Sequence, residues 1–283
     1  MAETRTSIGL LAWDQIRYQS RLFWRTPVAA FFTLAFPLMF LLLFSVLFGT
    51  EKFEITGRGT FSVAQFYAPA LAVFAAASAT YTNIGVGTAI ARDEGVLKRF
   101  RGTPLPPWTY MAGRIGSGVW IAFIATVVMM TVGVVVFDVN IDIAKLPAAL
   151  VTFVVGAACF AALGLALAAA SPTGDSAPAM ANATILPLAF VSDVFIAIDD
   201  PPEWLTAVGN FFPLKHFVRA FQDAFHPLVD SPGFEFDHLA VMAIWGVVGT
   251  LLALKFFTWE PRESTSGRRR RRRSGGSGAS GSE

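Results

Sequence analysis

Four long stretches of the chain contain no Asp, Glu, Lys or Arg, and this feature limits the fold more than any other. They are residues 26–50, 59–91, 115–137 and 146–174. A helix of about 20 apolar residues, rising 1.5 Å per residue, crosses a hydrocarbon core of roughly 30 Å. Charged residues make up only 15% of the chain, against about 25% in a typical soluble domain. The sequence therefore predicts an all-α membrane protein.

The hydropathy pattern predicts one membrane domain, residues 27–258, with six transmembrane helices. Their approximate ranges are 27–48, 63–90, 110–137, 146–170, 177–198 and 238–258. The fifth is the weakest because it contains Pro178, Pro187 and Asp193. The segment of about 200–228 is apolar, but it contains ionisable side chains and is divided by Pro213. We expect it to form two short re-entrant helices that dip into the outer leaflet and pack against protein.

Both ends of the chain are predicted to lie outside the hydrocarbon core. Residues 1–26 predict a cytoplasmic N-terminus with an amphipathic helix in the membrane interface, where the headgroup zone suits Trp13, Arg17, Arg21 and Arg25. Residues 259–283 contain six consecutive arginines followed by Gly and Ser, a composition typical of a disordered tail. Such a cytoplasmic tail either attracts anionic lipid or is solvated and only helps to fix the topology.

The distribution of basic residues predicts the orientation. The segments before the first span, between the second and third, and after the sixth hold ten basic residues, even without the six-arginine run. The other three main loops hold five, namely Lys52, Arg58, Lys145, Lys215 and Arg219. Cytoplasmic loops are enriched in Lys and Arg. We therefore expect both termini in the cytoplasm, in agreement with an even number of spans.

The sequence contains no recognisable catalytic, metal or nucleotide site. It has no Gly-Lys dipeptide, so the phosphate-binding P-loop pattern is absent. Three histidines fall in the predicted outer region, at spacings that do not match a two-histidine helical metal site: His216, His226 and His238. We expect no metal, no cofactor bound by this chain and no nucleic acid partner.

The segment from Ile90 to Arg101 predicts a short cytoplasmic helix between two long spans. At helical spacing Leu97 and Phe100 share one side, flanked by basic residues. Such a helix would serve as a lever through which a cytoplasmic partner moves the membrane domain. The alternative is an amphipathic loop helix that lies on lipid.

Three segments together form a recognisable pattern. They are IARDEGVLKRFRGTPL (90–105) followed by MAGR (111–114), FVSDVF (190–195) with PEWL (202–205) and FPL (212–214), and RTP (25–27) with FPL (36–38). Over about residues 8–260 this pattern resembles ABC-2-type transporter permeases, the membrane subunits of ABC exporters, in their drug-resistance, daunorubicin-exporter-like branch. Val96, Phe100 and Asp193 stand where the family usually has Thr, Leu and Gly.

The resemblance implies partners and a location. It implies six spans, a second permease subunit (identical or different), and two copies of a separate cytoplasmic ATP-binding subunit that holds ATP and Mg. That subunit would dock on the interfacial helix and on a coupling helix at about 91–103, through Arg92, Asp93, Glu94, Gly95, Leu97, Lys98, Arg99 and Phe100. The implied location is the bacterial cell membrane, surrounded by lipid.

Asp193 is the strongest candidate for a functional charged residue within a span, because ionisable groups in membranes are usually functional. Three roles stay open: contact with a cationic substrate, a bond to the re-entrant helices, and access to water at the helix end. Phenylalanines that would accompany it along a substrate path are Phe190, Phe195, Phe211 and Phe212.

These patterns favour the permease subunit of an ATP-driven exporter that moves a hydrophobic or amphipathic compound outward, such as a drug, lipid or glycolipid. Two other classes are weaker. A secondary transporter usually has paired ionisable residues near the bilayer midplane, and the sequence offers only Asp193. An intramembrane enzyme would need convergent catalytic groups at one depth, and the sequence shows no such set.

Overall fold

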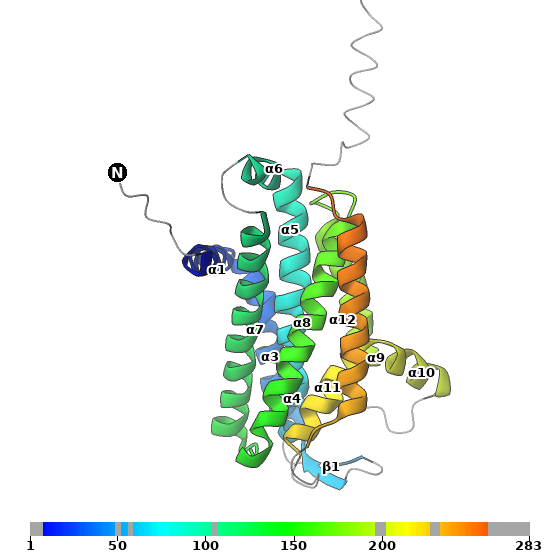
Figure 1. Ribbon diagram of the computed structural model, residues 1–283. Helices are drawn as coiled ribbons and strands as arrows, with labels where there is room; N and C mark the ends of the chain where they lie inside the picture. The colour runs from blue at the N-terminus through cyan, green and yellow to red at the C-terminus, as the bar shows by residue number, and fades with distance from the viewer. Residues whose placement is uncertain are drawn as a thin grey trace, which may run out of the picture.

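The computed structural model describes residues 8–48, 52–55, 59–102, 107–195, 202–226 and 233–259. Long helices run side by side, a short β-hairpin lies at one end of the bundle, and α6 lies at the other end (Figure 1). We call these the hairpin end and the α6 end. The elements in chain order are α1 (Ile8–Trp24), α2 (Pro27–Ala30), η1 (Phe31–Ala35), α3 (Phe36–Phe48), β1 (Lys52–Ile55), β2 (Gly59–Ser62), α4 (Val63–Ala77), η2 (Ser78–Thr82), α5 (Asn83–Asp93), α6 (Val96–Arg101), α7 (Pro107–Phe137), η3 (Ile143–Lys145), α8 (Leu146–Ala170), α9 (Ala177–Val191), α10 (Glu203–Phe211), α11 (Pro213–Ala224) and α12 (Phe236–Phe256).

Five helical segments within the described residues are long and apolar enough to cross a membrane. They are Pro27–Phe48, Val63–Asp93, Trp108–Phe137, Ile143–Ala170 and Phe236–Phe256. These segments coincide with the first, second, third, fourth and sixth spans predicted from the sequence. The agreement follows from the thickness of the bilayer, which demands an uninterrupted apolar helix of about 20 residues.

The predicted fifth span is shorter than expected. Helix α9 ends at Val191 and has 15 residues, which cover roughly 22 Å at 1.5 Å per residue. The helix cannot continue regularly, because Asp193 adopts a left-handed backbone conformation with φ 58°. Residues other than Gly, Asn and Asp rarely adopt this conformation.

The segment Val63–Asp93 is the central helix of the bundle. It consists of α4, the π-helical turn η2 and α5, and every residue of α4 is buried. Helix α4 packs on α3, α7 and α11, whereas α5 packs on α8 and α9. The alanines of α4 let its neighbours approach closely. A displacement of this helix therefore reaches most of the bundle.

The segment after α9 forms two short helices, divided at Pro213 as predicted. Helix α11 is largely buried and packs against α4, α8 and α12. Helix α10 projects from the side of the bundle (Figure 1) and exposes Trp204 and Phe211. This arrangement separates an anchored helix from one that faces the surroundings.

A short hairpin joins α3 to α4 in addition to the predicted helices. Strands β1 and β2 are antiparallel, with Phe53 opposite Phe61. The sequence of β1 alternates between charged and apolar residues, a period that suits a strand and not a helix. The prediction of an all-α fold therefore missed this strand pair, whereas the five membrane-crossing segments among the described residues are all helical.

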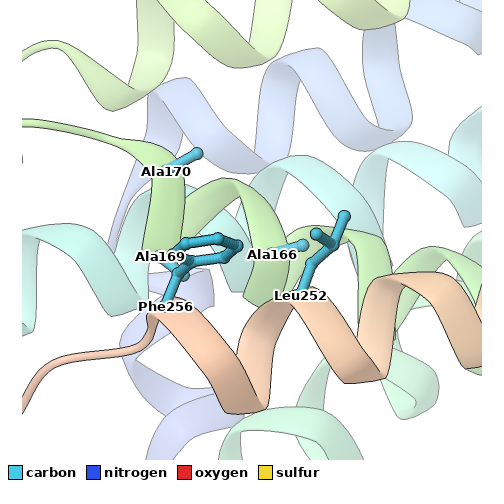
Figure 2. Close-up of a pocket in the computed structure, with 5 residues that line it drawn as sticks. All are labelled: Ala166, Ala169, Ala170, Leu252 and Phe256. Carbon is cyan, nitrogen blue, oxygen red and sulfur yellow. The ribbon is translucent and has the colours of Figure 1, made fainter.

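Helices α8 and α12 pack closely along much of their length. Near the α6 end they leave a groove of about 400 Å³ lined by Ala166, Ala169, Ala170, Leu252 and Phe256 (Figure 2). All five side chains are apolar. The groove therefore offers no polar side chain with which to select a substrate.

Candidate functional site

The predicted coupling segment forms an elbow at the α6 end of the bundle (Figure 1). Helix α5 ends at Asp93, and Gly95 adopts a φ of 70° before α6 begins at Val96. Glycine takes this left-handed conformation without the steric penalty of a side chain. The elbow thus places a short helix directly at the end of the central helix.

Helix α6 has one inward and one outward side. Leu97 is completely buried, and the Phe100 ring packs on Tyr110 with 5.5 Å between ring centroids. Glu94, Lys98 and Arg99 are exposed. We call these three residues the charged face.

The structure places two of the predicted docking residues in the interior of the bundle. Leu97 and Arg92 are 0% exposed, so their side chains are not available to a cytoplasmic partner. Leu97 belongs to the packing side of α6, and Arg92 makes hydrogen bonds within the chain. Asp93 also bonds to residues of this chain, and Gly95 supplies the bend. The exposed side chains among the predicted docking residues are those of the charged face.

Helix α1 presents its predicted interfacial residues outward. Trp13, Arg17, Arg21 and Arg25 are all exposed, whereas the opposite side of α1 packs on α7. A Cβ added at Gly113 of α7 would lie 2.5 Å from the Gln15 Cβ, so the two helices cross closely. The exposed side has the aromatic and basic character expected at a headgroup layer.

Arg114 is a residue of this region whose role the sequence does not reveal. Its guanidinium donates to the Gln19 side chain of α1 at 2.8 Å and to the Asn83 carbonyl of α5 at 3.3 Å. Ser20 and Ser117 add a hydroxyl contact of 3.0 Å between α1 and α7. Arg114 is the only charged residue in α7, and that isolation is the signal. It connects α1 to the central helix.

Asp193, beyond the end of α9, forms ion pairs with α11. Its Oδ2 atom lies 3.1 Å from the Arg219 guanidinium and 3.8 Å from the Lys215 Nζ. Arg219 is partly exposed and Lys215 is nearly buried. Of the three roles left open for Asp193, this geometry matches a bond to the short helices after α9.

The candidate phenylalanines fall into two separate groups. Phe195 is buried and contacts Phe40, Phe74 and Phe190. Phe211 and Phe212 contact Trp245 of α12, whose indole donates to the Phe211 carbonyl at 2.8 Å. The structure therefore joins the first group to α3 and α4, and the second to α12.

Two of the three histidines meet. His216 Nδ1 lies 2.8 Å from His238 Nδ1, and His216 Nε2 lies 2.7 Å from the Asn210 carbonyl. Among the residues that the structure describes, no group of three or more His, Cys, Asp or Glu is placed to hold a metal ion. The pair connects α10, α11 and α12.

Comparison with known proteins identifies the family of this chain. The family model for ABC-2 type transporters matches residues 10–226, which is most of the chain. The chain belongs to the ABC-2 type transporter family. One similar protein is the daunorubicin resistance ABC transporter permease protein DrrB1 of Streptomyces coeruleorubidus, 30% identical over 209 residues, or 71% of this chain and 69% of the relative. The resemblance predicted from the sequence is confirmed.

Membership defines the general role of this ABC-2 permease. It is a multi-pass membrane protein and the permease subunit of an ABC-2 type transporter, with no ATPase activity of its own. Members of this family work with an ATP-binding subunit.

Proposed function

We propose that this ABC-2 permease is half of a bacterial exporter that moves a hydrophobic or amphipathic compound, such as a drug, lipid or glycolipid, outward across the cell membrane. The similar protein is named for daunorubicin resistance, which supports a drug-like cargo. The observation that carries the proposal is the charged face of Glu94, Lys98 and Arg99. It is the exposed part of an elbow attached directly to the buried central helix.

Two copies of an ATP-binding subunit, holding ATP and Mg, dock on the charged face and on α1, one for each of two permease subunits. The second permease is identical or different. Closure of the ATP-binding subunits favours one state of the membrane domain, because their contact with the elbow differs between the two states. This chain supplies the path and holds no cofactor. Lipid covers its exposed apolar surface.

Both termini face the cytoplasm in this proposal. Helix α1 and the end of α12 both lie toward the α6 end (Figure 1), so the chain crosses the membrane an even number of times. Helix α9 then provides the sixth crossing within a domain of residues 27–258, and α10 and α11 form the outer re-entrant segment. The basic residues of the α6 end agree with this orientation. Tail residues 260–283, which lie outside the described residues, belong to the cytoplasmic side.

Transport by the purified components tests the proposal. The chain is isolated from native membranes, the attached proteins are identified, and both are reconstituted into vesicles with a fluorescent hydrophobic amine as cargo. We expect an ATP-binding subunit to copurify, and cargo to accumulate only when that subunit and ATP are present. Cargo movement by the chain alone, driven by an ion gradient, would instead make it a secondary transporter.

Asp193→Asn provides a separate prediction about the outer side. Because its carboxylate bonds to Arg219 and Lys215, we expect Asp193→Asn to loosen α11 and to reduce transport of cationic and neutral cargo by the same factor. Arg219→Gln should have the same effect, since it breaks the same pair. Transport assays with one cationic and one neutral dye check this. A loss confined to the cationic dye would assign Asp193 to substrate binding.

A further inference from the structure

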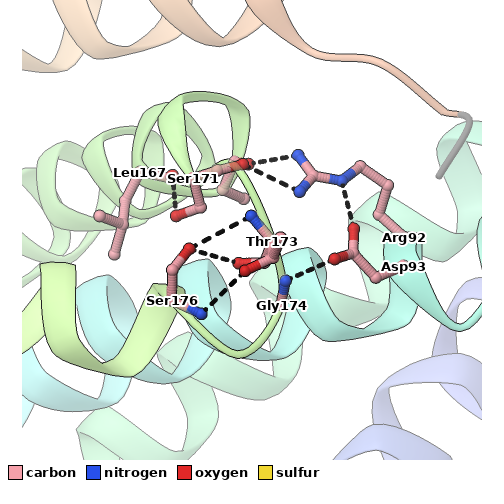
Figure 3. Close-up of polar contacts among 8 residues, drawn as sticks. Arg92, Asp93, Leu167, Ser171, Thr173, Gly174 and Ser176 are labelled. Atoms are coloured by element: carbon pink, nitrogen blue, oxygen red, sulfur yellow. Dashed lines mark hydrogen bonds and ion pairs between the residues drawn. The ribbon is translucent and has the colours of Figure 1, made fainter. Parts of the chain in front are cut away.

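Arg92, in the last turn of α5, is buried although it carries a charge. Its guanidinium donates to the Ala168 carbonyl at 2.9 Å, to the Ser171 carbonyl at 2.9 Å and to the Asp93 carboxylate at 3.0 Å (Figure 3). A buried charge is strongly unfavourable unless it is paired and hydrogen-bonded. These three bonds satisfy that need, and the two bonds to carbonyls join α5 to the end of α8.

The end of α8 offers a carbonyl acceptor that matches the Arg92 guanidinium. An α-helix leaves its last carbonyls without an intrahelical donor. The Ala168 carbonyl would normally accept from residue 172, but Pro172 has no N–H. Arg92 supplies the missing donor and also brings positive charge to a helix C-terminus, where the helix dipole favours it.

Asp93 extends the connection to the turn between α8 and α9. One of its carboxylate oxygens accepts from Arg92, and the other accepts from the Gly174 backbone N–H (Figure 3). A Cβ added at Gly174 would lie 2.9 Å from the Ile90 Cα, so the turn presses directly on α5. Only glycine permits this approach.

The turn itself is stiff. Thr173 and Ser176 exchange hydrogen bonds between their side chains and backbone N–H groups, both at 3.2 Å, and the Ser176 hydroxyl donates to the Thr173 carbonyl at 2.8 Å (Figure 3). Reciprocal bonds of this kind fix the first turn of a helix. A movement of the turn is therefore passed to the start of α9.

We infer that Arg92 and Asp93 clamp the end of α5 to the α8–α9 turn, so that a displacement of α6 is passed to α8 and α9. The inference rests on the proposed function, in which an ATP-binding subunit moves α6. Leu97 and the Phe100–Tyr110 contact hold α6 in place, and Arg99 donates to the Glu94 carbonyl across the elbow at 3.1 Å. Without the clamp, movement of α6 would end in bending of the last turn of α5.

The clamp differs from a docking contact in an observable way. Arg92 is 0% exposed, so it transmits movement and does not touch the partner. Arg92→Met removes the three donors and keeps an apolar stem of similar length, whereas Glu94→Gln removes one charge of the charged face and keeps the backbone carbonyl that accepts from Arg99. The substitution of Arg92 should therefore reduce coupling and leave binding of the partner unchanged. The substitution in the charged face should weaken that binding.

Distance measurements on the chain alone test the clamp without any partner. In a Cys159→Ala background, spin labels are attached at Lys98→Cys on α6 and Asp175→Cys on the turn, both exposed positions. We expect a narrow distribution of label distances in the parent and a broad one after Arg92→Met. Asp93→Asn, which keeps the side-chain shape, should broaden the distribution of label distances as well. It serves as the clamp variant if Arg92→Met does not purify as a single species. An unchanged narrow distribution in the variant that purifies overturns the clamp.

Reconstitution with the ATP-binding subunit tests the consequence. For Arg92→Met, or for Asp93→Asn in its place, we expect partner binding to stay within about twofold of the parent, while transported cargo per ATP hydrolysed falls on the order of three- to tenfold. Glu94→Gln should weaken binding and keep the narrow label distribution. Undiminished coupling in the clamp variant overturns the inference. Failure of the unmodified chain to bind any ATP-binding subunit overturns the proposed function instead, and the label distances still decide whether the clamp is rigid.

Discussion

Reversing two of the three basic charges of α6 in the double variant Lys98→Glu/Arg99→Glu is expected to abolish ATP-driven transport while the chain remains folded. Both side chains are exposed, and substitutions at exposed positions usually change stability by about 0.5 kcal/mol or less. At an interface, by contrast, like charges that face each other cost several kcal/mol. Since about 1.4 kcal/mol is tenfold in affinity, binding of the ATP-binding subunit should weaken by about tenfold or more.

Titration of the labelled ATP-binding subunit against the reconstituted permease measures this affinity. Lys255→Glu is the matched control, because Lys255 is an exposed lysine near the same end of the bundle, on α12. We expect that variant to bind and transport like the parent. If the double variant binds the subunit normally, the docking surface lies elsewhere and the elbow is not the contact that drives transport.

The sequence predicts the long helices well because the bilayer imposes one simple requirement on them. Each needs an apolar run of sufficient length, and such runs are visible in a single sequence. The end of α9 depends instead on the left-handed conformation of Asp193 and its ion pair with Arg219. Those two residues are distant in the sequence, so no local pattern reveals that they meet.

The candidate site shows a second limit of sequence reasoning. Helical periodicity correctly places Leu97 and Phe100 on the same side of α6, but it does not say whether that side faces solvent or protein. The structure turns it inward. A Leu97→Asp substitution would therefore disrupt the elbow itself and cannot serve as a probe of docking.

The hydrogen-bond partners of Arg92 could not be predicted from the sequence. Two of its three acceptors are backbone carbonyls, those of Ala168 and Ser171. Every residue has a carbonyl, so side-chain identity gives no hint of such a contact. The only local sign is Pro172, which leaves the Ala168 carbonyl without its usual donor.

A single added methyl group at Gly164 is expected to destabilise the membrane domain strongly. Its Cβ would lie 2.7 Å from the Tyr81 carbonyl oxygen and 2.9 Å from that of Thr80. Both atoms belong to the backbone of the central helix and cannot move aside as a flexible side chain can. Overpacking of this kind costs about 1–3 kcal/mol, and each kcal/mol lowers the melting midpoint by about 2–4 °C in chains of 150–250 residues. We expect Gly164→Ala to melt roughly 2–12 °C below the parent in detergent.

Gly246→Ala separates this effect from a general intolerance of larger residues between helices. Its Cβ would approach only to 3.4 Å of the Cys159 Cα, an ordinary contact, so its melting midpoint should match the parent. Gly85→Ala should resemble Gly164→Ala, because its Cβ would lie 2.8 Å from the Gly164 carbonyl oxygen. Since both substitutions push apart the same pair of helices, their combined effect should be smaller than the sum of the two. Unchanged melting of Gly164→Ala would mean that α8 and the central helix are not in backbone contact, and the route from α5 to α8 would then depend on the Arg92 clamp alone.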